Sequence, residues 1–162
     1  MLRNQKKLIA ILDKKNGLAL GHRRLSILDL TSNGNQPMLS ANKRYVIVFN
    51  GEVYNHLKIR DKLINSNIEW KSNSDTETLL ETISIFGIKS ALELSVGMFA
   101  FALWDKQEEI LTLGKDRFGE KPLYYGWIKN SFVFSSELKS LKEFKNFDNR
   151  ISKNALAQYL KY

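Results

Sequence analysis

The sequence predicts an α+β domain whose strands pair in antiparallel fashion. Strand-like segments outnumber helical ones, they occur as neighbours joined by short polar turns, and the main helical block lies between them, over residues 56–87. This grouping indicates at least two layers and differs from the strand–helix alternation of a parallel sheet. A chain of 162 residues is long enough to form one domain with a sizeable core.

The first half of the chain begins with three predicted strands. They cover residues 8–12, 18–20 and 24–30, and the turn Asp-Lys-Lys-Asn-Gly separates the first two. Pro37 then favours extended backbone at Gln36. Residues 45–49 place Val, Ile and Val between aromatic residues, which predicts a buried strand.

The helical block contains two predicted helices. Residues 56–66 have apolar side chains near one face, and residues 74–87 give a stronger pattern. Ser74 and Glu77 have the spacing of a capping box, and Gly87 marks the expected C-terminal end. Between them we expect one apolar stripe, formed by Leu79, Leu80, Ile83 and Phe86.

The second half of the chain predicts two further strand pairs and a terminal helix. The pairs are residues 97–105 with 109–116, and residues 123–128 with 132–136. Polar turns join the strands of each pair. Ser152 is the expected N-cap of a short helix over residues 152–162.

Composition excludes several classes of function. There is no cysteine, so the 162 residues contain no disulfide, no thiolate metal site and no cysteine nucleophile. The histidines, His22 and His56, have no acidic or histidine neighbours at ligand spacing, so we expect no metal site. No apolar run is long enough to span a membrane and no signal peptide is recognisable, so we expect a cytoplasmic protein with no membrane partner.

The formal net charge of +8 raises the question of nucleic-acid binding. A nucleic-acid binder concentrates its Lys and Arg in a stripe interleaved with aromatic residues. Here the basic residues spread from Arg3 to Lys161, a distribution more typical of a solvated surface. We therefore expect no nucleic-acid partner.

The segment VIVFNGEVYNH, residues 46–56, is the most informative one. Asn-Gly after an apolar run is a strong hairpin signal, yet the following residues are polar and then helical. The side-chain amide of Asn50 and the N–H of Gly51 are adjacent donors that suit a developing negative oxygen, as in an oxyanion hole. Glu52, beside them, is placed to bind a second polar group of a ligand.

Two charged residues have both a structural and a functional interpretation. Arg24 is either a solvated residue at a strand end or a bidentate clamp for a carboxylate. Asp75 is either a first-turn acid that favours the helix dipole or an acceptor for an ammonium group. A clamp for a carboxylate, an acceptor for an amine and paired donors for a carbonyl oxygen together fit glutamine.

The motifs occur along the chain in the order GLALGHRRLSILDL, NQPM, VIVFNGEVYNH, SDTET, VGMFAFALWD, DRFGEKPLYYG and FSSELKSL. In this order they resemble the glutaminase domain of glutamine-hydrolysing asparagine synthetases, which are class II glutamine amidotransferases. The resemblance covers residues 17–162, and residues 1–16 do not match. It implies the N-terminal-nucleophile fold, a four-layer αββα sandwich of antiparallel sheets.

The resemblance also implies roles for particular residues. Asn50 and Gly51 would form the oxyanion hole, Glu52 would contact the substrate, and Asp75 would hold the α-ammonium of glutamine. The glutamine carboxylate would be bound by Arg24 together with the backbone of Leu25, Ser26, Ile27 and Leu28. Asp116, Arg117 and Lys121 would lie near the path toward a synthetase domain.

The chain departs from the family at its start, which reads Met1-Leu2 where the family has a catalytic cysteine after the initiator methionine. We expect a partial glutaminase domain that lacks the family's first strand and helix and contains no ATP-binding synthetase domain. The parent reaction would be glutamine-dependent, ATP-driven amidation of aspartate to asparagine. This domain would need no cofactor, since ATP and magnesium would belong to the synthetase domain.

We therefore expect a chain that retains a glutamine pocket and is inactive alone, since a thiol must attack the glutamine amide. The alternative is a non-catalytic ligand-binding or scaffold module that packs on a synthetase partner. Expected partners are glutamine and either a synthetase domain or a second copy of the chain.

Overall fold

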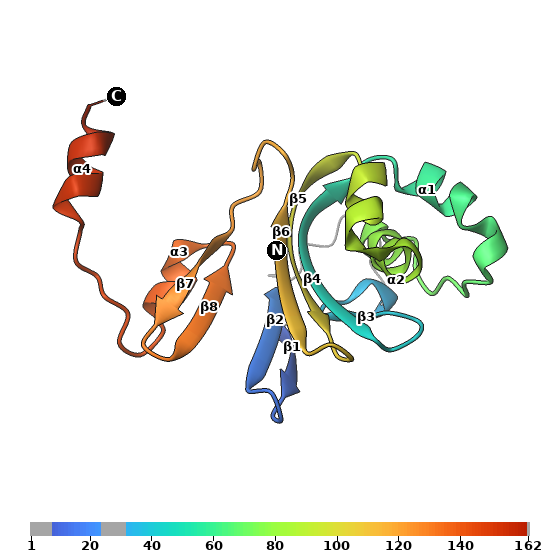
Figure 1. Cartoon of the computed structure of the whole chain (residues 1–162), viewed down its shortest axis with the longest axis horizontal. Helices are drawn as coiled ribbons and strands as arrows, with labels where there is room; N and C mark the ends of the chain where they lie inside the picture. The colour runs from blue at the N-terminus through green and yellow to red at the C-terminus, as the bar shows by residue number, and fades with distance from the viewer. Residues whose placement is uncertain (1–7, 24–31, 162) are drawn as a thin grey trace, which may run out of the picture. The chain divides into compact units, whose positions relative to one another are not determined.

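The computed structural model describes residues 8–23 and 32–161. The chain forms two compact units, Met1–Lys121 and Pro122–Tyr162, which we describe separately (Figure 1). The third predicted strand, residues 24–30, lies entirely outside the described residues, as do Arg24, Leu25, Ser26, Ile27 and Leu28 of the predicted site.

The first unit is built on a four-stranded antiparallel sheet with the strand order β3-β4-β5-β6. Its centre is the pair β4 (Tyr45–Val53) and β5 (Gly97–Asp105), which match residue for residue along their whole length. The short β3 (Met38–Leu39) and β6 (Ile110–Lys115) flank this pair. Both central strands are rich in the β-branched and aromatic residues that pack well on a pleated surface.

The core lies between this sheet and the helices α1 (His56–Lys62) and α2 (Asp75–Leu94), which cover one of its faces (Figure 1). A short 3₁₀ turn, Ile64–Ser66, follows α1. Full burial of each large apolar side chain contributes about 1.5–3 kcal/mol. The buried side chains of this core include Ile47, Phe49, Val53, Ile59, Leu63, Leu79, Leu80, Ile83, Ala91, Phe99, Phe101 and Leu103.

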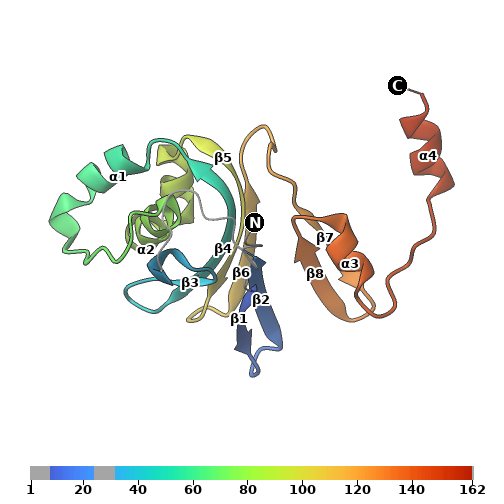
Figure 2. The same ribbon diagram turned by 180° about the vertical axis from the view of Figure 1, so that it is seen from behind.

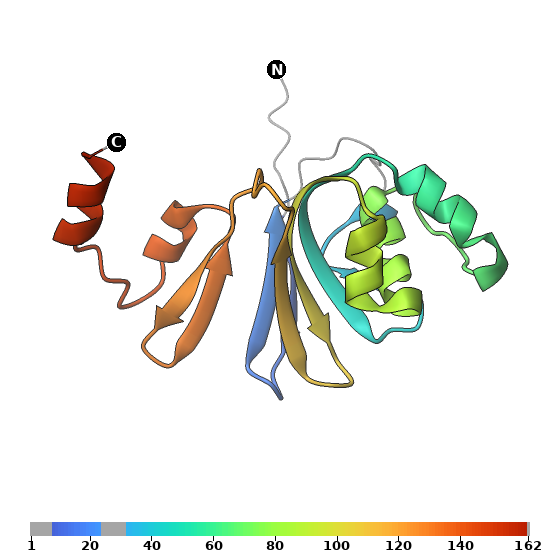
Figure 3. The ribbon, with the colours of Figure 1, turned by 45° about the horizontal axis from the view of Figure 1, so that its top comes forward.

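The opposite face of the sheet is covered by a hairpin. Within the described residues, β1 (Leu8–Asp13) and β2 (Leu18–Arg23) pair with each other alone, and β2 contacts β4. Figure 3 shows this hairpin in blue beside the sheet. The buried Leu20 belongs to this hairpin, and Val46, Val48, Ala100, Ala102 and Trp104 are the buried residues of the covered face. Helices, sheet and hairpin are thus three successive layers, which confirms the predicted α+β class with antiparallel sheets.

Helix α2 consists of two helical segments separated at Gly87. That residue has φ 79° and ψ 165°, which is not helical, so the first segment ends where predicted. A second segment, which was not predicted, follows across the kink and runs to Leu94, and its Ala91 is completely buried in the core. Phe86, predicted in the apolar stripe, is instead 45% exposed just before the kink.

The capping box at the start of α2 is only half formed. Ser74 is the N-cap and its side chain accepts the N–H of Thr76, as expected. Glu77 does not reach back to Ser74; its carboxylate accepts the backbone N–H groups of Lys71 and Ser72, each at 2.8 Å. The segment before the helix therefore folds back over its first turn.

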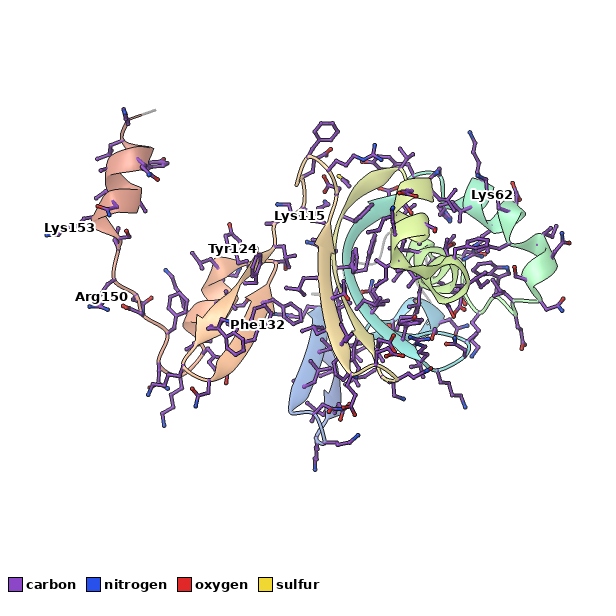
Figure 4. The ribbon with its side chains drawn as sticks, in the orientation of Figure 1. Lys62, Lys115, Tyr124, Phe132, Arg150 and Lys153 are labelled. Atoms are coloured by element: carbon purple, nitrogen blue, oxygen red, sulfur yellow. The ribbon has the colours of Figure 1, made fainter. Side chains whose placement is uncertain are left out.

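The second unit contains the antiparallel hairpin of β7 (Tyr124–Ile128) and β8 (Ser131–Ser135), followed by α3 (Leu138–Lys142) and α4 (Lys153–Tyr159) (Figure 2). The hairpin was predicted, as was α4 with its N-cap Ser152, which accepts the N–H of Ala155. Helix α3 was not predicted. On β8, Phe132 contacts the rings of Trp127 and Tyr125 (Figure 4).

Candidate functional site

The predicted site residues that the structure describes lie where β4 ends and α2 begins. The Asn50-Gly51-Glu52 segment is part of β4 and does not form a turn, because β4 continues to Val53 in register with β5. Asp75 is the first residue of α2. These two elements are joined directly, since a carboxylate oxygen of Asp75 accepts the N–H of Val53 at 2.8 Å.

Gly51 is required by the packing of β4 on β5. It stands opposite Phe99, and a Cβ added at Gly51 would lie only 2.5 Å from the Cα of Phe99 and would collide with the carbonyl oxygen of Met98. Gly97 on β5 is confined in the same way by the backbone of Glu52. The strands approach so closely here that only glycine fits.

The backbone donors at the end of β4 alternate in direction, as in any strand. The N–H of Phe49 donates to Gln36 Oε1 at 2.6 Å and that of Val53 donates to Asp75 Oδ2 at 2.8 Å, both on the side away from β5. Gly51 lies midway between them, so its N–H points toward the same side.

The partner across the sheet agrees with this direction. Phe99, opposite Gly51, donates its N–H to the Asp116 carboxylate at 3.1 Å and accepts the Asp116 N–H at 2.8 Å. Because Phe99 directs both groups away from β4, it takes nothing from Gly51. Among residues 8–23 and 32–161 no acceptor is bonded to the Gly51 N–H. Within this part of the chain it is therefore an open donor between two donors that are occupied.

Asn50 and Glu52 have side chains on the other face of β4, together with Val46 and Val48. This is the face against which β2 lies, and both residues are only partly buried. β2 ends at Arg23, one residue before the predicted clamp Arg24.

Asp75 is buried and both of its carboxylate oxygens are used. Oδ1 accepts the N–H of Thr76 and Oδ2 accepts that of Val53, each at 2.8 Å. The structural interpretation of Asp75 as a helix-end acid is thus correct. It leaves room for the functional one, because an ionised carboxylate offers about four acceptor positions.

His56 adds a titratable group beside these carboxylates. Burial lowers the pKa of His56, while the charges of Asp75 and Glu52 act to raise it and that of Arg60 acts to lower it. Its buried Nδ1 atom has no hydrogen-bond partner within the described residues. His56 was noted in the sequence only as an improbable metal ligand, and its position beside the site was missed.

A polar cluster behind Asp75 holds the segment that leads into α2. Arg60 donates through Nε to Thr78 Oγ1 at 2.8 Å and through its terminal nitrogen to the carbonyls of Ser72 and Ser74 at 3.0 Å. Its guanidinium lies over the ring of Trp70, 4.1 Å from the centroid. Burial lowers the pKa of Arg60, and the negative charge of Glu77 partly offsets this shift.

Sequence reasoning did not assign this cluster to the site. The available signal was an arginine on the inner face of a predicted helix, followed by a tryptophan and a glutamate before the next helix. Arg60 and Glu77 lie 3.6 Å apart, and both contact Ser72. The cluster thereby fixes the approach to Asp75.

Asp116, expected near a path to a synthetase domain, organises the loop after β6. Its carboxylate accepts backbone N–H groups from Phe99, Phe118 and Glu120. Burial acts to raise the pKa of Asp116, but these donors outweigh it and the pKa lies below its usual value. A cavity of about 390 Å³ lies between this loop, the neighbouring Lys115 (Figure 4) and the end of α2.

Among the described residues there is no group of three His, Cys, Asp or Glu side chains able to hold a metal ion. None of the helices in this part of the chain is long and apolar enough to cross a membrane.

Comparison with known proteins gives the same assignment as the motifs. The chain is 42% identical over 145 residues to asparagine synthetase [glutamine-hydrolyzing] 1 of Bacillus subtilis, covering 90% of this chain and 22% of that protein. It is 36% identical over 162 residues to the putative asparagine synthetase [glutamine-hydrolyzing] 2 of Methanocaldococcus jannaschii, covering 90% and 31%. The chain thus spans between a fifth and a third of these relatives.

Solved structures confirm the fold. The structure of glutamine phosphoribosylpyrophosphate amidotransferase from B. subtilis, complexed with ADP and GMP, superposes with a TM-score of 0.65 at 25% identity, over 76% of this chain and 28% of that one. This neighbour is an N-terminal-nucleophile amidotransferase, as the resemblance implied. The profile of the glutamine amidotransferase domain matches residues 10–162, and the chain belongs to that family.

Proposed function

We propose that the chain is the glutamine-binding part of the glutaminase domain of an asparagine synthetase-like protein. The observation that carries the proposal is the open Gly51 N–H, held beside the buried carboxylate of Asp75 at the junction of β4 and α2. The relatives named above, which are glutamine-hydrolysing asparagine synthetases, support it. The parent reaction is the ATP-driven transfer of the glutamine amide nitrogen to aspartate.

Each end of glutamine has a group suited to it. The Gly51 N–H and the Asn50 side-chain amide donate to the carbonyl oxygen of the glutamine side chain, where negative charge develops on attack. Asp75 accepts from the α-ammonium, and Glu52 contacts the substrate. The α-carboxylate is bound by Arg24 and by the adjoining backbone of Leu25, Ser26, Ile27 and Leu28.

The chain as it stands binds glutamine without hydrolysing it. Hydrolysis in this family needs a thiol that attacks the amide carbon, and the 162 residues include no cysteine. The donors that stabilise the oxyanion lower the barrier only when a nucleophile creates one. A synthetase domain or a second copy of the chain is the proposed protein partner, with ATP and magnesium held by the synthetase domain. A cytoplasmic location stays a prediction.

Titration calorimetry with L-glutamine tests the binding. We expect a saturable heat with L-glutamine and none with D-glutamine, whose α-ammonium and α-carboxylate are interchanged relative to the site. An absence of heat with millimolar L-glutamine contradicts the proposal and favours the alternative, a scaffold module that packs on a synthetase partner without binding the amino acid.

An ammonia-release assay tests the second half of the proposal. With excess glutamine, the expected ammonia signal equals that of a heat-inactivated sample. Turnover above that control means that another group replaces the thiol, and it disproves the inactivity.

A further inference from the structure

Gln36 occupies the place where strand β3 stops. Met38 pairs with Ile47 and Leu39 with Val46, so the same register places Gln36 opposite Phe49. The intervening Pro37 has no N–H, which removes a ladder donor and favours the end of the strand. The side-chain amide of Gln36, like a peptide group, has a carbonyl oxygen and an N–H donor. It bonds to β4 here in place of the backbone of β3.

Both ends of that amide are bonded inside the protein. Gln36 is 6% exposed. Its Oε1 accepts the N–H of Phe49 at 2.6 Å and its Nε2 donates to Thr76 Oγ1 at 3.3 Å. Phe49 immediately precedes Asn50, and Thr76 immediately follows Asp75. One side chain thus touches the neighbours of the proposed oxyanion donor and of the proposed ammonium acceptor.

These bonds close a ring around the Gly51 N–H. From Gln36 the ring passes to Thr76, whose N–H donates to Asp75 Oδ1, and then through Asp75 Oδ2 to the N–H of Val53. It returns along β4 to Phe49 and Gln36. The open donor lies in the middle of the strand segment that the ring encloses, where β4 packs against the start of α2.

A purely structural role does not account for the whole arrangement. Buried polar groups are almost always hydrogen-bonded, so an acceptor for the Phe49 N–H is needed in any case. Any acceptor would serve that need. The second bond, from Nε2 to Thr76, connects the strand to a different element, the first turn of α2, and closes the ring.

We propose that Gln36 is a positioning residue that sets the spacing between the Gly51 N–H and the Asp75 carboxylate, and thereby the side-chain length of the amino acid that fits. This inference rests on the proposed function. The site binds the carbonyl oxygen at one end and the α-ammonium at the other, so a fixed spacing favours glutamine over asparagine, which is shorter by one methylene group. Gln36 itself does not touch the ligand.

Gln36→Met tests the spacing, because methionine has a similar length and volume but no hydrogen-bonding amide. We expect the dissociation constant for L-glutamine to rise at least tenfold in calorimetry, and the preference for L-glutamine over L-asparagine to fall several-fold. The ratio of the two dissociation constants is the decisive readout, because a loss of folded protein lowers the apparent affinity for both ligands equally.

Two further variants serve as matched comparisons. Glu81→Met removes another buried side chain that connects the same region to α2, through the Ala41 N–H at 2.7 Å, but its bond lies outside the ring. We expect Glu81→Met to keep the wild-type ratio whatever its melting temperature. Gln36→Glu should restore the wild-type ratio of the two dissociation constants, because its carboxylate still accepts the Phe49 N–H and the Thr76 hydroxyl can rotate to donate.

The outcomes separate this inference from the proposed function. If the wild type binds glutamine and Gln36→Met keeps its ratio, the inference is wrong while the proposed function stands. If the wild type binds no glutamine, the proposed function is wrong. Amide hydrogen exchange then tests whether Gln36 positions β4 relative to α2. Faster exchange of the Val53 N–H in Gln36→Met than in Glu81→Met supports the positioning role, because Gln36 does not contact Val53; equal exchange overturns it.

Discussion

The carboxylate of Asp75 accepts the backbone N–H of Val53 at 2.8 Å, so the first residue of α2 is bonded to the last residue of β4. This bond is local in space and distant in sequence. It places a buried negative charge beside a strand whose Gly51 N–H remains open. The end of β4 and the start of α2 together form the candidate site, which neither element forms alone.

The charge of Asp75 should be essential for glutamine binding. Asp75→Asn keeps the shape and one acceptor for the Val53 N–H but removes the charge that binds the α-ammonium. Hydrogen bonds to charged groups contribute about 1.5–3 kcal/mol, which corresponds to an affinity loss of roughly ten- to a hundredfold. Calorimetry measures the loss. Asp61→Asn, a change at an exposed position on α1, is the control and should leave affinity unchanged.

Gly51 should tolerate no side chain. Gly51→Ala places a methyl group 2.5 Å from the Phe99 Cα and against the Met98 carbonyl oxygen, so the strands must separate. Overpacking of this kind costs about 1–3 kcal/mol, and more where backbone must move. Urea unfolding followed by circular dichroism measures the change. Gly126→Ala, where an added Cβ meets nothing within 4 Å, should cost much less; equal losses would contradict the steric argument.

Arg60 should contribute to stability through the cluster behind Asp75. Arg60→Met keeps the stem that packs near Trp70 but removes the donors to Thr78, Ser72 and Ser74. Leaving these partly buried acceptors unpaired should lower the free energy of unfolding by about 1–3 kcal/mol. Thermal unfolding checks this. Lys62→Met, at an exposed position of the same helix (Figure 4), should change it little.

His56 should make the folded state less stable in acid. Its pKa is lowered from 6.5, chiefly by burial, so the unfolded state binds more protons in the pH range just below 6.5. Stability therefore falls as the pH drops from 6.5 through the lower pKa of the folded state, and it is fully retained above 6.5.

His56→Gln is the variant that isolates this effect. We expect the difference in the free energy of unfolding between the wild type and this variant to change only as the pH falls from 6.5 through the lower pKa of folded His56. The subtraction is needed because burial raises the pKa of Glu81, whose contribution has the opposite sign. Parallel curves for the two proteins would contradict the assignment to His56.

The parts of the fold that local patterns determine were predicted from the sequence. The apolar runs of β4 and β5 and the Ser74 cap of α2 depend on neighbouring residues, and they lie where we expected them. The exposure of Phe86 and the second helical segment of α2, beyond Gly87, were not predicted. The burial of Ala91 in the core stabilises that segment, and the local sequence pattern does not indicate this contact.

The candidate site was proposed from residue types, and its hydrogen-bond connections could not be predicted from the sequence. Asn50, Gly51 and Asp75 were selected because their donors and charge suit an amino acid. The bond of Gln36 to Thr76 joins residues 40 positions apart, and that of Arg60 to Thr78 joins residues 18 apart. No periodicity links such pairs, because they meet only when the sheet and α2 pack together.

The carboxylate of Asp116 binds three backbone N–H groups of its surroundings within 3.2 Å, so it defines the path of the main chain after β6 without help from the intervening side chains. The side chains of Arg117 and Phe118 are consequently exposed and take no part in holding that path, although the Phe118 N–H does. A single buried carboxylate therefore sets the course of this turn, and both side chains are left free to face solvent.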